Sequence, residues 1–307
     1  MLKRTNILAM VGGGINPKFS KNKITIFDSH QSLIMSQIRF NSNITKVKLG
    51  LDCIIGFIID KIYIFNINTL ETVDIIEINE ITNPIFGSSN INNKLVIGYP
   101  QYNNKGKLQI GKYFIAKNKY KKETLSINAH ESNIVFIAIN NEGTLIVTGS
   151  EKGQCLRIFD TLNGNLLAAL KRGKTKIYWI SIDSNNDIVG YISEVGKIYL
   201  YNISEIKKGI NKNIRFNVIN KNKNKNNKSE ENNSKENINK IHEINKINIK
   251  SFAKFKINEN KNIIGFIEPK SVVILNLQGK LYKTSYNENT GKICFLNEAS
   301  YIKIDNK

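Results

Sequence analysis

Short runs in which apolar and polar residues alternate recur along the chain and indicate β-strands. The runs are rich in Ile, Val, Phe and Tyr, and turns containing Gly, Asn or Asp separate them. Examples are KITIFD at 23–28, KIYIFN at 61–66, LIVTGS at 145–150 and VVILNL at 272–277. Long helical periodicity is absent, and the chain has only 4 prolines. The pattern therefore predicts an all-β protein.

The strands also form a repeat. The expected third strand of each repeat carries a recognisable residue pair: Ile26-Phe27, Ile64-Phe65, Gln109-Ile110, Ile158-Phe159, Leu200-Tyr201 and Leu281-Tyr282. Successive pairs are 38, 45, 49, 42 and 81 residues apart. A period of roughly 40 to 50 residues with four strands per unit is typical of the blades of a β-propeller. The last spacing is nearly double the others, which predicts an insertion in one blade.

The insertion is visible in the composition of residues 204–250. This tract contains 12 basic and 5 acidic residues, a net charge of +7 in 47 positions. Its middle, KNKNKNNKSEENNSKEN, has no apolar residue, so we predict that it is disordered. The predicted organisation is one domain with propeller blades over 1–203, this Asn/Lys-rich loop within a blade over 204–250, and the last strands and blade over 251–307.

Charge and cysteine content narrow the class of protein. The 45 Lys and Arg residues against 25 Asp and Glu give a net charge of +20, and 46 residues are Asn. Such a charge favours an anionic partner (nucleic acid, a membrane surface or an acidic protein), although a Lys/Asn-rich compositional bias is the alternative. No run approaches the roughly 18 apolar residues of a spanning helix. Cys53, Cys155 and Cys294 form no CxxC pair, which excludes an obvious zinc site or disulfide framework and fits the cytosol.

Sequence signals for catalysis are absent. The glycines at 12–14 are not followed by the GKS or GKT of a phosphate-binding loop, and His30, His130 and His242 are dispersed. The basic residues do not interleave with aromatic residues as they do in nucleic-acid readers. We therefore expect no enzyme activity, cofactor, metal ion, small-molecule substrate or nucleic-acid partner.

The most specific string surrounds the best-formed repeat. Ala129-His130, LIVTGS, CLRIFD and LLAAL follow the order of a WD40 blade, with Phe159-Asp160 where the Trp-Asp pair would stand. The longer string AHESNIVFIAINNEGTLIVTGSEKGQCLRIFDTLNGNLLAALKRG resembles the PROPPIN family, β-propellers that bind polyphosphoinositides, in the order AHESPL, GTLLATASEKGT, IRIF and Phe/Leu-Arg-Arg-Gly. RTNILAMVGGGINPKFSKNKITIFD resembles the second-blade segment of that family, and SFAKF resembles the stretch after its long loop.

The resemblance implies a seven-bladed fold with two lipid-headgroup pockets on its rim. The first pocket would use His130, Ser150, Arg157 and Lys171, and the second would use Arg172 and Ser193. A guanidinium can donate two hydrogen bonds to one phosphate, and Ser and His add directional bonds. Taken alone, these residues would have ordinary roles as turn partners, caps and solvated charges.

The chain also departs from the family pattern. Lys171 stands where the family has its first Arg, and Gln154 stands where it has Thr. Lys197 and Tyr199 stand at the Thr and His of the second pocket, so we expect the first pocket to be the better conserved. The chain begins almost at the second blade of the family, which predicts five full blades and three strands of a sixth. A truncated gene model, a different ring closure and a strand from a partner are the alternatives.

The implied function is that of a non-enzymatic peripheral membrane effector. It would bind phosphatidylinositol 3-phosphate or 3,5-bisphosphate and recruit autophagy or membrane-trafficking machinery. It would be cytosolic and recruited to phosphoinositide-bearing membranes, docking through two pockets and a basic loop. The alternative is a WD40-like protein-interaction scaffold that does not bind phosphoinositides.

Overall fold

The computed structural model divides into two compact units, Met1–Thr144 and Leu145–Lys307, and nearly all regular secondary structure among the described residues is β-strand. The described residues are 5–80, 83–115, 119–152, 154–173, 175–204, 206, 248–257, 262–267, 270–276 and 278–300. Side chains are described for all of these except 248 and 295–300. The predicted all-β class is confirmed.

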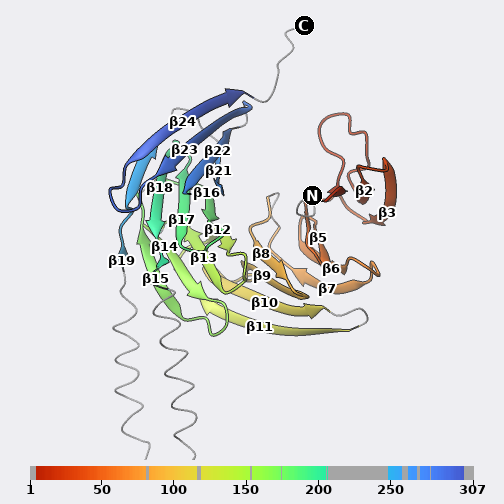
Figure 1. Cartoon of the computed structure of the whole chain (residues 1–307). Helices are drawn as coiled ribbons and strands as arrows, with labels where there is room; N and C mark the ends of the chain where they lie inside the picture. Colours follow the sequence, from red (N-terminus) through yellow and green to blue (C-terminus); the bar gives the residue numbers. More distant parts are fainter. Residues whose placement is uncertain are drawn as a thin grey trace, which may run out of the picture. The chain divides into compact units, whose positions relative to one another are not determined.

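The first unit contains three antiparallel sheets, drawn in red to yellow in Figure 1, and ends with β12 (Ile134–Ile139). The first sheet has three strands in the order β1-β2-β3, and the next two have four strands each, in the orders β4-β5-β6-β7 and β8-β9-β10-β11. The bounds are β1 (Ile7–Met10), β2 (Lys23–Asp28), β3 (Leu33–Arg39), β4 (Lys46–Leu49), β5 (Cys53–Phe57), β6 (Lys61–Asn66), β7 (Thr72–Glu77), β8 (Gly87–Ile91), β9 (Lys94–Pro100), β10 (Lys107–Ile115) and β11 (Tyr120–Asn128).

The second unit continues the series with the orders β13-β14-β15-β19, β16-β17-β18-β20 and β21-β22-β23-β24, drawn in green to blue. The pairing is antiparallel except between β15 and β19, which run parallel. The bounds are β13 (Leu145–Ser150), β14 (Cys155–Asp160), β15 (Leu166–Lys171), β16 (Ile177–Ile182), β17 (Ile188–Ser193), β18 (Lys197–Asn202), β19 (Asn248–Ile249), β20 (Ala253–Lys256), β21 (Asn262–Ile267), β22 (Ser271–Asn276), β23 (Lys280–Tyr286) and β24 (Ile293–Ser300).

The predicted residue pairs lie where the repeat requires. Four of them fall in the third strand of a four-stranded sheet (β6, β10, β18 and β23), Ile158-Phe159 falls in β14, and Ile26-Phe27 falls in β2. At three pairs the register to the following strand shifts: Ile26-Phe27, Ile64-Phe65 and Ile158-Phe159. A bulge lets two residues face one on the partner strand and increases the local twist. These three pairs therefore mark a bulge in the pairing with the following strand.

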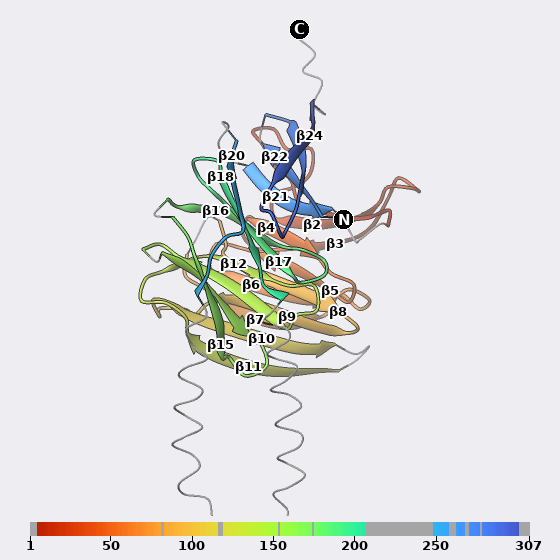
Figure 2. The same ribbon diagram turned by 60° about the vertical axis from the view of Figure 1, so that its left-hand side comes forward.

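The predicted insertion lies between the third and fourth strands of one sheet. β18 ends at Asn202 and β20 begins at Ala253, yet the two strands pair side by side (Figure 2). The predicted disorder of the tract concerns residues outside the described part of the chain. The prediction of one domain over the whole chain stays a prediction.

Isoleucine accounts for much of the core, because β-branched side chains suit a pleated, buried surface. In the first unit, the sheets of β4–β7 and β8–β11 bury one cluster that contains Ile55, Ile62, Ile64 and Ile97. Asparagine serves the turns. Asn92-Asn93 joins β8 to β9 with φ values of 49° and 60°, which is the type I′ conformation that matches the twist of a two-residue hairpin.

Candidate functional site

Three of the six predicted site residues share one face of β13, β14 and β15. Arg157 lies opposite Thr148 on β13 and opposite Ala169 on β15. Ser150 and Lys171 each lie two residues further along these strands, so their side chains project from the same face as that of Arg157. Ser150 is 1% exposed, Arg157 is half-buried and Lys171 is exposed. The face thus passes from a buried hydroxyl to an ammonium group in solvent.

Arg172, the next residue, is buried and only 6% exposed. Its guanidinium donates to the backbone carbonyl oxygens of Ser150 (2.9 Å), Gly173 (3.2 Å) and Thr175 (2.6 Å). Burial lowers the pKa of the guanidinium below its ordinary value. The three acceptors are neutral, so they orient this cation without cancelling its charge. A buried cation beside an exposed one creates a locally positive site.

Three stacked tyrosines of β17 and β18 hold the segment that carries these two cations. The Tyr201 hydroxyl donates to the Lys171 carbonyl at 2.5 Å, and the Gly173 amide donates to the Tyr191 hydroxyl at 3.2 Å. The Tyr191 ring stacks on Tyr199 with centroids 4.7 Å apart and on Tyr201 at 6.2 Å. Burial raises the pKa of Tyr191 and Tyr201, so both hydroxyls stay protonated. We call Tyr191, Tyr199 and Tyr201 the tyrosine cluster.

Sequence reasoning missed the role of this cluster, although a signal was present. Tyr199 and Tyr201 alternate in the string IYLY at 198–201, which places both on one face of β18. The register pairs Tyr191 with Tyr199, so the cluster covers the same face of the sheet. That face contacts the segment 171–173, a relation that no spacing along the chain reveals.

Ser193, the predicted residue of the second pocket, ends β17 and is 1% exposed. Its hydroxyl oxygen accepts a hydrogen bond from the Lys197 amide at 3.1 Å, which closes the turn into β18. Ser193 lies two residues from Tyr191 and so on the face of the tyrosine cluster. The structure therefore places both predicted members of the second pocket, Arg172 and Ser193, in the second unit around that cluster.

His130 belongs to the first unit, where it follows β11. Its amide and that of Ala129 donate to the Gly106 carbonyl at 2.9 and 3.0 Å. Gly106 has φ of +71°, and a Cβ there would lie 1.8 Å from the His130 carbonyl oxygen. The backbone of His130 is thus fixed by a turn that needs glycine. Its grouping with Ser150, Arg157 and Lys171 stays a prediction.

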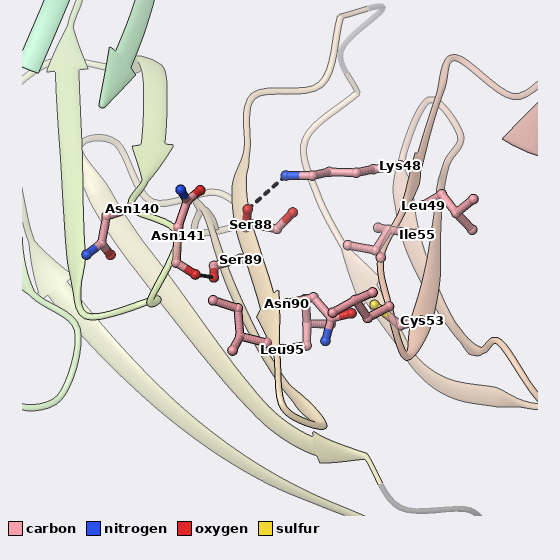
Figure 3. Close-up of a pocket in the computed structure, with 13 residues that line it drawn as sticks. Lys48, Leu49, Cys53, Ile55, Ser88, Ser89, Asn90, Leu95, Asn140 and Asn141 are labelled. Atoms are coloured by element: carbon pink, nitrogen blue, oxygen red, sulfur yellow. Dashed lines mark hydrogen bonds between the residues drawn. The ribbon is translucent and has the colours of Figure 1, made fainter. Parts of the chain in front are cut away.

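A cavity of about 450 Å³ lies within the first unit, between β4, β8 and the segment after β12 (Figure 3). The Lys48 ammonium donates to the Ser88 carbonyl at 2.8 Å, and the Ser89 hydroxyl donates to the Asn141 carbonyl. The polar groups in these two pairs thus satisfy each other's hydrogen-bonding capacity, and the cavity lining contains none of the six predicted site residues. The cavity therefore adds no member to the candidate site.

No helix in the described part of the chain has the length and apolar character needed to cross a bilayer. No three His, Cys, Asp or Glu residues among those described gather closely enough to hold a metal ion.

Solved structures define the class of the fold. The structure matches Hsv2 of Kluyveromyces lactis with a TM-score of 0.72 and 17% identity, covering 98% of this chain and 85% of that one. It matches a complex of KlAtg21 with the coiled-coil of AgAtg16 with a TM-score of 0.71 and 19% identity, covering 98% and 84%. The fold is that of a β-propeller protein.

The sequence comparisons place the chain within this class. The PROPPIN family model matches residues 16–209, which is more than half of the chain, and the chain belongs to this family. Autophagy-related protein 18e of Arabidopsis thaliana is 29% identical over 208 residues, covering 66% of this chain and 53% of the relative. Autophagy-related protein 18 of Komagataella pastoris is 24% identical over 238 residues, covering 67% and 44%. The chain spans about half the length of these relatives.

Proposed function

We propose that this protein is a non-enzymatic peripheral membrane effector that binds phosphatidylinositol 3-phosphate or 3,5-bisphosphate and recruits autophagy machinery. The observation that carries the proposal is the pair Lys171 and Arg172. The Lys171 ammonium is exposed, and the adjacent Arg172 guanidinium is buried and donates to neutral backbone carbonyls. Hydrogen bonds from the tyrosine cluster fix the segment 171–173 that carries both cations. Among the described residues no carboxylate forms an ion pair with Lys171 or Arg172, and such a preorganised pair of cations suits a phosphate ligand.

Membership of the PROPPIN family and the autophagy-related names of the relatives support the same function. The net charge of +20 favours attraction to an anionic leaflet, where each nearby Lys or Arg contributes about 1 kcal/mol. We expect the protein to be cytosolic and to be recruited to membranes that carry these lipids.

Vesicle binding tests the proposal, and the structure decides which variant to use. Replacing Arg172 would also remove three structural hydrogen bonds, so Arg157→Gln with Lys171→Gln is the cleaner variant. With two charges lost at about 1 kcal/mol each, affinity for vesicles containing phosphatidylinositol 3-phosphate should fall roughly thirtyfold. Exposed Lys105 and Lys119, changed to Gln together, provide a control of equal charge. Equal losses in the two variants would contradict the assignment of the site.

The protein-interaction scaffold is a second candidate function. Ser150 and Ser193 are each only 1% exposed, so their hydroxyl groups are little accessible to a lipid headgroup. KlAtg21 has been solved with the coiled-coil of AgAtg16. A pull-down with an Atg16-type coiled-coil, performed without membranes, separates the candidates. Coiled-coil binding together with no preference for phosphoinositide vesicles would support the scaffold.

A further inference from the structure

The face of the sheet that carries the tyrosine cluster also presents three lysines. In the register of β18 and β20, Lys197 lies opposite Lys256, and Tyr199 lies opposite Lys254. These four residues share one face, because the members of each strand are two positions apart. Lys254 and Lys256 are exposed, and Lys197 is half-buried. We call these three residues the lysine face.

The lysine face is an unfavourable arrangement in the unliganded protein. Residues directly opposite in an antiparallel pair have Cβ atoms about 5 Å apart, and like charges there repel. No carboxylate from the described part of the chain forms an ion pair with any of the three lysines. The Lys254 ammonium lies 5.1 Å from the centroid of the Tyr199 ring, which partly compensates that one charge. An anion bound over this face of β18 and β20 would relieve the remaining repulsion between the lysines.

Buried polar atoms beside the same tyrosine point to a ligand independently. The Nε of Arg172 and the Oγ1 of Thr175 are buried and make no hydrogen bond with any described residue. A Cβ built on Gly173 would lie 3.2 Å from the Tyr199 hydroxyl and 4.0 Å from that Oγ1. The unsatisfied Oγ1 of Thr175 therefore lies near Tyr199, the tyrosine that borders the lysine face, and a buried polar group without a partner is destabilising.

We propose that the lysine face makes the second pocket selective for an inositol headgroup that carries two phosphates, with Lys254 and Lys256 as the residues that set this selectivity. The proposal rests on the proposed function. The row of Lys197 and Lys256 and the row of Lys254 lie two residues apart, about 7 Å along the strands. Two rows of positive charge suit two phosphates on one ring, and lysines suit phosphates because they act as mobile point charges.

The test compares vesicles that contain phosphatidylinositol, its 3-phosphate or its 3,5-bisphosphate, with phosphatidylserine added so that all have equal charge. The wild-type protein should bind the bisphosphate vesicles at least about tenfold more tightly than the monophosphate vesicles. Changing Lys254 and Lys256 to Gln should lower the affinity for the bisphosphate vesicles more than the affinity for the monophosphate vesicles, so that the two affinities come within about twofold of each other. Lys254→Arg with Lys256→Arg should keep the preference, because the charge is retained.

Soluble ligands separate a headgroup site from attraction to the membrane surface. Inositol 1,3,5-trisphosphate, the water-soluble headgroup, should bind the wild type in calorimetry and lose affinity in the Gln variant, whereas inorganic phosphate should bind weakly to both. Fluorescence of Trp179, the single tryptophan, shows that each variant is folded.

The results that would contradict the proposal each concern a different part of it. An undiminished bisphosphate preference in the Gln variant, or equal loss for both lipids, contradicts the selectivity role of the lysine face. Equal wild-type affinity for the two lipids contradicts the selectivity itself but leaves phosphoinositide binding standing. Failure of the wild type to bind either lipid above the phosphatidylserine control contradicts the proposed function. Binding of an acidic peptide or RNA at this face, in place of the headgroup, would also overturn the inference.

Discussion

The Tyr201→Phe variant tests whether the tyrosine cluster fixes the segment that carries Lys171 and Arg172. The substitution keeps the ring, which is fully buried and stacked on Tyr191, and removes one hydroxyl. It leaves the Lys171 carbonyl without its 2.5 Å hydrogen bond. This hydrogen bond is part-buried, so its loss should lower the free energy of unfolding by about 1 kcal/mol.

Urea unfolding followed by Trp179 fluorescence provides the assay. Trp179 lies on β16, so its signal reports on the second unit, which contains the tyrosine cluster. Tyr102→Phe, at a side chain that is 48% exposed, is the control and should change stability by less than about 0.5 kcal/mol. A Tyr201→Phe protein that unfolds within about 0.5 kcal/mol of the wild type would refute the role assigned to this bond.

Three further outcomes follow from the geometry. Arg172→Lys should lower the unfolding free energy by about 3 kcal/mol in the same assay, because an ammonium cannot reproduce the hydrogen bonds to three carbonyls. A loss below about 1 kcal/mol would contradict the structural role given to these hydrogen bonds. Gly106→Ala should destabilise the first unit by at least about 2 kcal/mol in calorimetry, because its Cβ would meet the His130 carbonyl; an unchanged melting temperature would contradict this. Burial raises the pKa of the Cys53 thiol from 9.0 to about 12, so a disulfide reagent at pH 8 should label exposed Cys294 and reach Cys53 only on unfolding. The unfolded chain loses the Cys53 proton first, so this thiol's stability contribution is complete below pH 9 and declines as pH rises towards 12.

The sequence predicts the series of strands well, because each strand has a recognisable local pattern of residues. A run such as IYIF at 62–65 or LRIF at 156–159 consists mainly of strand-forming apolar residues and is bounded by turn residues, so its type and its period do not depend on distant contacts. The bulge at Ile64-Phe65 and at Ile158-Phe159 was not predicted. A bulge changes pairing with the next strand, and the recurring pair of residues records it only indirectly.

The candidate site was predictable in part. Arg157 and Lys171 share a face because alternation along neighbouring strands is a local rule, and the family motif selects the same residues. The inward turn of Arg172 was not predicted, since it depends on carbonyls contributed by Ser150 and Thr175. Lys254 and Lys256 were not predicted as site residues for a simpler reason. They lie opposite Tyr199 and Lys197 on β18, but the 204–250 tract separates them from that strand in the sequence, so no local pattern joins them.

Flotation of the protein with vesicles tests the central claim most directly. Vesicles with phosphatidylinositol 3-phosphate or 3,5-bisphosphate are compared with phosphatidylserine vesicles of equal charge, for the wild type, the Arg157/Lys171 variant and the Lys105/Lys119 control. The account predicts that the wild type and the control float with the phosphoinositide vesicles and that the Arg157/Lys171 variant does so roughly thirtyfold more weakly. Equal flotation with phosphatidylserine, or equal flotation of both double variants, would contradict it.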